Sequence, residues 1–167
     1  MTARYLFLLG LLAAAPCSAG EAVLQWNDPS RYTDIAPGPG TAKATLASMQ
    51  RAFTGAFQQS AAALPEGYTF SAVISNVDLA GQVNPPQAMN PNLMNTRVLT
   101  QNYFPSIILS YELTGPDGEV LASGNDVLIT DMDYLSRSTS VNASTPFYFE
   151  DRMIRNWFAR TIMPQVK

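Results

Sequence analysis

Hydrophobic and polar residues alternate from Pro105 to Asp131 with the period of a β-strand. The run Gly115 to Gly118 interrupts the alternation with the composition of a tight turn. Together they predict a β-hairpin, with a bulge in its second arm at Gly124. One face of the first arm carries four apolar side chains: Ile107, Leu109, Tyr111 and Leu113.

Two other stretches have the three- and four-residue spacing of amphipathic helices. The first follows Thr41, a candidate N-cap, and ends before Pro65. Its apolar stripe consists of Leu46, Met49, Phe53, Phe57, Ala61 and Leu64. The second begins at Thr145-Pro146, with Pro146 in the first helical position. Its stripe consists of Met153, Ile154, Trp157, Phe158 and Ile162, and we expect its solvated face to carry Glu150, Asp151, Arg152, Arg155 and Arg160.

Shorter patterns predict the remaining strands. A strand from Ala22 to Trp26 opens the domain, and a second one runs from Tyr68 to Asp78. Because Val73 and Val77 lie on the other face of this second strand, we expect it to be central and covered on both sides near its end. The segment from Thr96 to Phe104 is compatible with a short strand or one helical turn; we expect the strand, with Arg97 exposed.

The order of these elements predicts the fold class. One helix lies on each side of a strand-rich middle, which is typical of an α+β two-layer sandwich. We expect a mostly antiparallel sheet of four or five strands with both helices on one face. The segment 82–95 is rich in proline and asparagine and is predicted to be a long loop.

The first residues have the pattern of a secretory signal peptide. Arg4 precedes an apolar run from Tyr5 to Ala15, which is too short to span a bilayer, and small residues follow it. Cleavage after Ala19 leaves a single domain, 20–167, with no transmembrane span, in the periplasm or secreted. Lipid attachment at Cys17 is the alternative, and Pro16 directly before it argues against this.

Charge and composition exclude several classes of function. The chain has a net charge of −3 and no histidine, and its single cysteine lies within the predicted signal peptide. The acidic balance offers no basic field for nucleic acid. Without histidine or a mature cysteine, Ser-His-Asp and Cys-His catalytic sites and the usual zinc sites are impossible. Only Lys43 and Lys167 remain for a Ser-Lys mechanism, and no phosphate-binding glycine loop is present.

The remaining candidates for chemistry are carboxylates and one arginine. Paired carboxylates hold hard cations or hydrolyse glycosides, and the candidate binding residues are Asp78, Arg97, Asp126, Asp131 and Asp133. In the simpler interpretation, Asp131 ends its strand by capping loop amides, and the other aspartates are solvated. Met89 and Met94 have a spacing seen in copper(I) sites, although loop methionines are more often hydrophobic anchors. We expect no metal and no cofactor.

Several motifs together resemble the exported bacterial family called domain of unknown function 3016. They are Trp26-x-Asp28-Pro29-x-x-Tyr32-Thr33-Asp34, Asp78-Leu79-Ala80-Gly81, Arg97-Val98, Tyr103-x-Pro105, the Tyr111 strand with Gly118 and Gly124, Asp131, and the helix from Glu150 to Trp157. The resemblance implies export in Gram-negative bacteria and no established activity. The chain departs from the family pattern at Asn76, at Ser106 and in the long Asn/Pro loop. We expect the motif residues to be structural: Trp26, Asp28, Pro29, Asp34, Gly81, Pro105, Tyr111, Gly118, Gly124 and Trp157.

Three classes of function remain open. We expect a non-catalytic binding or interaction protein of the cell envelope, whose partner is an envelope protein or another envelope component. The alternative is a carrier of a small ligand or a divalent cation. A carboxylate-dependent hydrolase is the third, and it requires two carboxyl groups that converge in a cleft. The sequence predicts no oligomeric state.

Overall fold

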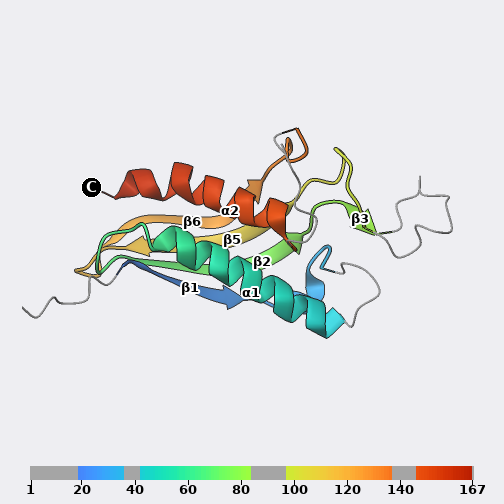
Figure 1. Cartoon of the computed structure of the whole chain (residues 1–167). Coiled ribbons are helices and arrows are strands. Elements are labelled where there is room, and N and C mark those ends of the chain that lie inside the picture. Colours follow the sequence, from blue (N-terminus) through green and yellow to red (C-terminus); the bar gives the residue numbers. More distant parts are fainter. Residues whose placement is uncertain (1–18, 36–41, 84–96, 137–145, 167) are drawn as a thin grey trace, which may run out of the picture.

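The computed structural model describes residues 19–35, 42–83, 97–136 and 146–166 (Figure 1). The elements are β1 (Glu21–Trp26), η1 (Pro29–Arg31), α1 (Ala42–Ala61), β2 (Thr69–Asp78), β3 (Gln82–Val83), β4 (Arg97–Val98), β5 (Ser106–Thr114), β6 (Val120–Thr130), α2 (Tyr148–Thr161) and η3 (Met163–Gln165). The predicted cap Thr41, both loop methionines and nearly all of the predicted signal peptide lie outside the described residues.

Four strands form the main sheet in the order β1-β2-β5-β6. The pairs β2–β5 and β5–β6 are antiparallel, so the predicted sheet is confirmed as mostly antiparallel. The pair β1–β2 is parallel, which makes the sheet mixed. Helix α1 lies between these two strands in the chain, and a helical crossover returns the chain to the same end of the sheet before the next strand begins. Strands β3 and β4 form a separate two-stranded sheet.

Both helices pack on one face of the main sheet, as predicted. They run side by side in the same direction across it (Figure 1). Their apolar stripes meet the inward side chains of the strands in one hydrophobic core, whose largest fully buried members include Phe53, Phe57, Phe70, Phe158, Ile107 and Leu109. The result is the two-layer α+β sandwich that the order of elements predicted.

The predicted hairpin is confirmed, and so is the bulge beside Gly124. The pairing of β5 and β6 slips between Leu109 and Tyr111, and Asp126 adopts a left-handed backbone conformation there, with φ 49°. Gly124 lies opposite Tyr111. A side chain on Gly124 would place its Cβ 2.7 Å from the Tyr111 ring, so the close approach requires glycine.

Strand β2 is central, as predicted, but it is not covered on both faces. Val73 is 39% exposed on the face of the sheet that is opposite the helices. A register shift between Ile74 and Asn76 changes the direction of the following side chains, so Val77 is buried in the core instead of covering the outer face. In the described part of the chain, the outer face of the sheet therefore remains open.

Candidate functional site

A cluster of charged side chains lies where β2 ends. Asp34 forms a parallel bridge with Asp78, in which the Leu79 N–H donates to the Asp34 carbonyl at 3.2 Å. The Arg97 guanidinium donates to both carboxylate oxygens of Asp34, at 3.1 and 3.0 Å. Nη2 makes both of these bonds, and Nη1 donates to the carbonyl of Gly81 at 2.8 Å. This end of the sheet is therefore held by one arginine that joins three segments of the chain.

The expectation that Arg97 is exposed is wrong. Only 15% of its side chain is accessible, because the backbone carbonyls at the end of β2 and the Asp34 carboxylate surround its guanidinium. A planar guanidinium satisfies several acceptors at once, which makes arginine suited to such a position. Gly81, whose carbonyl accepts a hydrogen bond from Arg97, has a φ angle of 79°. A Cβ at this position would lie 2.6 Å from the Val98 carbonyl oxygen.

Asp78 has a perturbed acidity within this cluster. Burial raises the pKa of the Asp78 carboxyl, and the nearby Asp34 carboxylate raises it further. The Arg97 guanidinium acts in the opposite direction and lowers this pKa. Two carboxyl groups and one guanidinium thus share the site, and the arginine contacts Asp34 most closely.

Glu150 extends the cluster to the helical layer. It is 3% exposed in the first turn of α2, and its Oε1 accepts a hydrogen bond from the Ala80 N–H at 2.7 Å. Burial raises the pKa of Glu150, while the Ala80 hydrogen bond and Arg97 lower it. The expectation that Glu150 lies on a solvated face is wrong. It precedes Ile154 by four residues and so falls in phase with the apolar stripe, a signal that would have identified it.

Asp131 pairs with Arg152 on the other side of the same helix. The distance between Nη2 and Oδ2 is 3.1 Å, and the Asp131 side chain is 9% exposed. Arg152 also donates to the carbonyl of Tyr134 at 2.6 Å, and its guanidinium lies 5.7 Å from the centre of the Phe149 ring. Arg152 is therefore mostly buried instead of solvated, and Asp131 serves as the acceptor of an ion pair instead of a cap. Tyr134, which follows β6, is fully buried.

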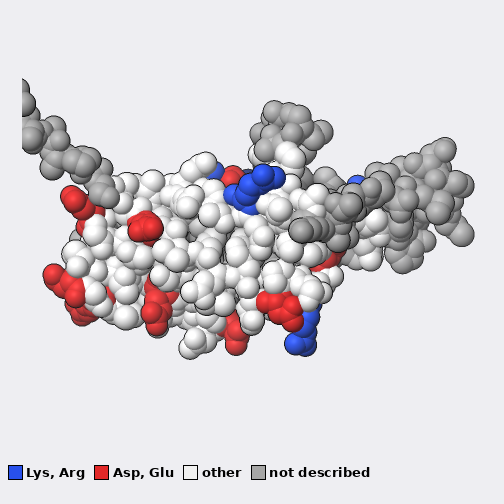
Figure 2. Space-filling model, turned by 90° about the horizontal axis from the view of Figure 1, so that it is seen from below, with Lys and Arg blue, Asp and Glu red and all other residues white. Residues whose placement is uncertain are grey.

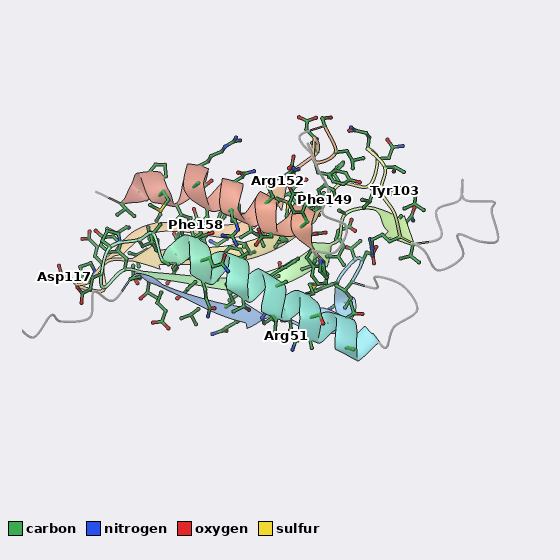
Figure 3. All side chains as sticks on the ribbon, viewed as in Figure 1. Arg51, Tyr103, Asp117, Phe149, Arg152 and Phe158 are labelled. Carbon is green, nitrogen blue, oxygen red and sulfur yellow. The ribbon has the colours of Figure 1, made fainter. Side chains whose placement is uncertain are left out.

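Figure 3 shows Arg152 and Phe149 together on the first half of α2, far from Asp117 in the hairpin turn. The two remaining aspartates lie elsewhere in β6 and after it. Asp126 is exposed in the bulge, where its N–H donates to the Ser110 hydroxyl at 3.1 Å, and Asp133 is exposed beyond the strand. Among the described residues, no group of three or more acidic, histidine or cysteine side chains is placed to hold a metal ion. The structure therefore joins Asp78 and Arg97 but separates the candidate carboxylates.

The aromatic motif residues lie in and around the core. The ring of Trp157 is 5.4 Å from Tyr111 and 6.1 Å from Phe70, both in edge-to-face arrangements. Trp26 packs against Phe53 at 6.3 Å. These contacts connect α2 to β2 and β5, and β1 to α1, through the same apolar layer.

Two of the hollows on the described surface outside this cluster border the main sheet. One, of about 300 Å³, lies on the open face of the sheet and is lined by residues that include Val23, Gln25, Ser71, Val73 and Glu112. The other, of about 310 Å³, is a groove between β6 and α2, lined by residues that include Leu128, Met132, Asp133, Trp157 and Arg160. We call the face of the sheet that is opposite the helices the open face, and we call the second hollow the β6–α2 groove.

The charges are unevenly distributed over the elements. The four strands of the main sheet contain Glu21, Asp78, Glu112 and Asp126, and they contain no lysine or arginine. Figure 2 shows one side of the molecule, on which acidic side chains are scattered and basic ones are few. The arginines of the helical layer are Arg51, Arg152, Arg155 and Arg160. The sheet is thus the acidic layer of the sandwich.

Comparison with known families adds one finding. A family model described as protein of unknown function (DUF3016) matches residues 20–160. The chain belongs to this family. The comparisons with curated proteins and with solved structures found no match. The predicted family is thus confirmed. A separate observation is that none of the helices in the described ranges is long and apolar enough to cross a membrane.

Proposed function

We propose that this DUF3016 domain is a non-catalytic binding protein of the cell envelope. The signal-peptide pattern of residues 1–19 supports export to the periplasm. The partner is a protein that presents basic residues to the open face. One observation carries this proposal: the helices cover a single face of the sheet, and the strands that form the other face contain no lysine or arginine.

The open face has the composition of a transient protein interface. Val23 and Val73 are exposed there, 41% and 39%, beside the polar side chains of Gln25 and Ser71. Such interfaces combine an apolar centre with a polar rim that forms hydrogen bonds. Glu112 stands on the same surface and provides a negative charge at its edge.

The charge of the open face favours a protein over a lipid surface. Anionic lipids give a membrane surface a negative potential, which repels an acidic face. A protein surface that carries lysine or arginine is attracted instead, and such complementarity raises the rate of association and fixes orientation. Glu21 and Glu112 are the exposed carboxylates of β1 and β5 available for this contact.

Site-specific photo-cross-linking in the cells that naturally make the protein tests the proposal. A photoreactive residue replaces Ser71 on the open face, and a control replaces Gln58 on the exposed surface of α1. We expect a covalent adduct with another protein from position 71 and little or none from position 58. No adduct from position 71, or equal adducts from both positions, would overturn the proposal.

A charge variant makes the test specific. Glu112→Lys on the open face is expected to reduce the yield of the position-71 adduct several-fold, because it repels a basic partner. Glu66→Lys changes an exposed acid between α1 and β2 and serves as the matched control, with an unchanged yield. Equal yields for the two variants would contradict a charge-guided contact at this face.

A further inference from the structure

A line of apolar side chains crosses the open face obliquely. It has one member on each strand of the main sheet: Val23, Val73, Ile108 and Leu128. Val73 lies two residues beyond Ser71, the partner of Val23, and Ile108 lies two residues before Ser110, the partner of Val73. Ile108 is paired directly with Leu128. We call these four residues the apolar row.

The apolar row is long and well exposed. Val23, Val73 and Leu128 are 41%, 39% and 59% exposed, whereas the neighbours of Ile108 in β5 point into the core. Same-face residues of a strand are about 7 Å apart and adjacent strands about 5 Å apart, so the row is about 20 Å long. Single exposed apolar residues are ordinary, but a continuous line of them across a sheet indicates a contact surface. The row ends beside the β6–α2 groove, which Leu128 also lines.

Two carboxylates lie along one side of the apolar row. Glu21 precedes Val23 by two residues and so shares its face of β1, and Glu112 is the partner of Ser71. Among the described residues, neither carboxylate has a hydrogen bond or an ion pair, so both are available to a partner. The hollow on the open face extends from Val73 to Glu112, and a long basic side chain that leaves the row through it reaches Glu112.

The other side of the row is different. Gln25 and Asn76 are the nearest outward side chains of β1 and β2 there, and both are uncharged. Asp78 lies farther along β2, in the cluster that already contains the Arg97 guanidinium. The open face therefore presents an apolar line with free acids on one side only.

The backbone of the sheet decides which kind of segment covers this line. Strands β2 and β5 are each paired along both edges, so their N–H and C=O groups are used within the sheet. An extended segment laid over this face loses water from its own backbone and finds no main-chain partner in return. A helix satisfies its backbone internally, and apolar residues at three- and four-residue spacing form a straight stripe along it.

We infer that the protein partner lays an amphipathic helix along the apolar row, with lysine or arginine on the side that faces Glu21 and Glu112. The helix covers the sheet from the face opposite α1 and α2, which gives a layer of helix on each face. A second copy of the chain offers no such helix from its described part, because α1 and α2 bury their apolar stripes in their own core. This inference rests on the proposed binding role and names the element of the partner that is bound.

The test measures the form of the bound segment from two contact points. Photoreactive residues replace Val23 and Leu128 separately, in the cells that naturally make the protein, and mass spectrometry identifies the cross-linked residues of the partner. Since a helix rises about 1.5 Å per residue and a strand about 3.3 Å, the row spans about 13 residues of a helix or about 6 of an extended segment. We expect both positions to cross-link to one segment of one protein with the helical separation. The extended separation, or contacts in unrelated segments, would overturn the inference.

A pair of variants tests the apolar row itself. Val73→Asp places a charge in the middle of the row and is expected to reduce the adducts from positions 23 and 128 several-fold. Val120→Asp is the matched control, because Val120 is 51% exposed at the start of β6 and lies outside the row, and we expect unchanged adducts. Thermal unfolding checks that both variants fold, and Val73→Ser replaces Val73→Asp if it does not. Equal yields for the two folded variants would overturn the inference.

The outcomes separate this inference from the proposed function. An adduct from position 71 with none from positions 23 and 128 would overturn the bound helix and leave the proposed function standing. No adduct from any of the three positions would overturn both. An adduct with the mass of two copies of this chain would overturn the inference.

Discussion

Arg97 binds both carboxylate oxygens of Asp34 across 63 residues of sequence. The pair connects the loop after β1 to the short strand β4, and the same guanidinium contacts the carbonyls after β2. The side chains are 15% and 23% exposed, so the pair is only weakly screened by solvent. It is therefore the principal polar connection at this end of the sheet.

Replacement of Arg97 tests that role. Arg97→Ala removes the hydrogen bonds that Arg97 donates to Asp34 and to three backbone carbonyls, and we expect the free energy of unfolding to fall by about 2 kcal/mol, less than for a fully buried pair. Arg97→Lys is expected to recover only part of this loss, because an ammonium group cannot donate to both oxygens in one plane. Urea denaturation measures both variants. The control is Arg51→Ala on the exposed surface of α1, and a loss as large as that of Arg97→Ala would contradict the assignment.

Glu150 predicts an unusual dependence of stability on pH. Burial raises its pKa in the folded protein above the ordinary value of 4.5, so the folded state binds the proton more tightly than the unfolded state does. The stability from this proton is fully present below pH 4.5 and is lost as the pH rises through the folded-state pKa. Glu150→Gln keeps an oxygen for the Ala80 N–H and removes the charge. We therefore expect the variant to be at least as stable as the wild type at pH 7.

Unfolding free energies of both proteins between pH 4 and pH 8 check this expectation. The wild type should lose stability relative to Glu150→Gln as the pH rises. Asp78 also has a raised pKa and remains in both proteins, so its contribution largely cancels in the comparison. Parallel curves over the whole range would show that Glu150 does not titrate differently in the folded and unfolded states.

Substitutions at two glycines distinguish the cost of a left-handed backbone from the cost of steric overlap. Gly81 and Gly118 have nearly equal φ angles, 79° and 78°, but only Gly81 has neighbours where a side chain would go. Gly118→Ala is expected to cost about 1 kcal/mol for the left-handed conformation. Gly81→Ala is expected to cost about 3 kcal/mol, because its Cβ also overlaps the Val98 carbonyl. Thermal unfolding of both variants measures the difference, and equal losses would contradict the overlap.

The buried phenol of Tyr32 gives a spectroscopic prediction. Its hydroxyl donates to the Ile74 carbonyl at 2.9 Å, and burial, with a smaller contribution from Asp28, raises its pKa to about 12. Folded-state stability from this group is present below pH 10 and declines as the pH rises through 12. Absorbance titration of the folded protein should show a tyrosine component near pH 12 that Tyr32→Phe removes. Tyr32→Phe should also reduce stability at pH 7 by about 1 kcal/mol.

Local periodicity was sufficient for most of the fold. The apolar stripe from Leu46 to Leu64 predicted α1, and the alternation around Gly118 predicted the β5–β6 hairpin. These patterns are visible in the sequence because each one depends on neighbours within about two turns of helix or one pair of strand residues. The start of α2 was misplaced by two residues, at Pro146 instead of Tyr148, since helix ends depend on weak local preferences.

The sequence by itself thus determined the order of the two helices and the four main strands, the layer architecture, the family and the absence of histidine chemistry, but it placed β3 in a predicted loop, 82–95. Tertiary structure alone decided the parallel pairing of β1 with β2, the open face at Val73 and the partners of Arg97 and Glu150. Such features join residues tens of positions apart, and no short pattern encodes which distant segment will approach. Folding alone made the Asp34 carboxylate the partner of Arg97 and the Ala80 N–H the partner of Glu150, and burial in this fold raises the pKa of Glu150.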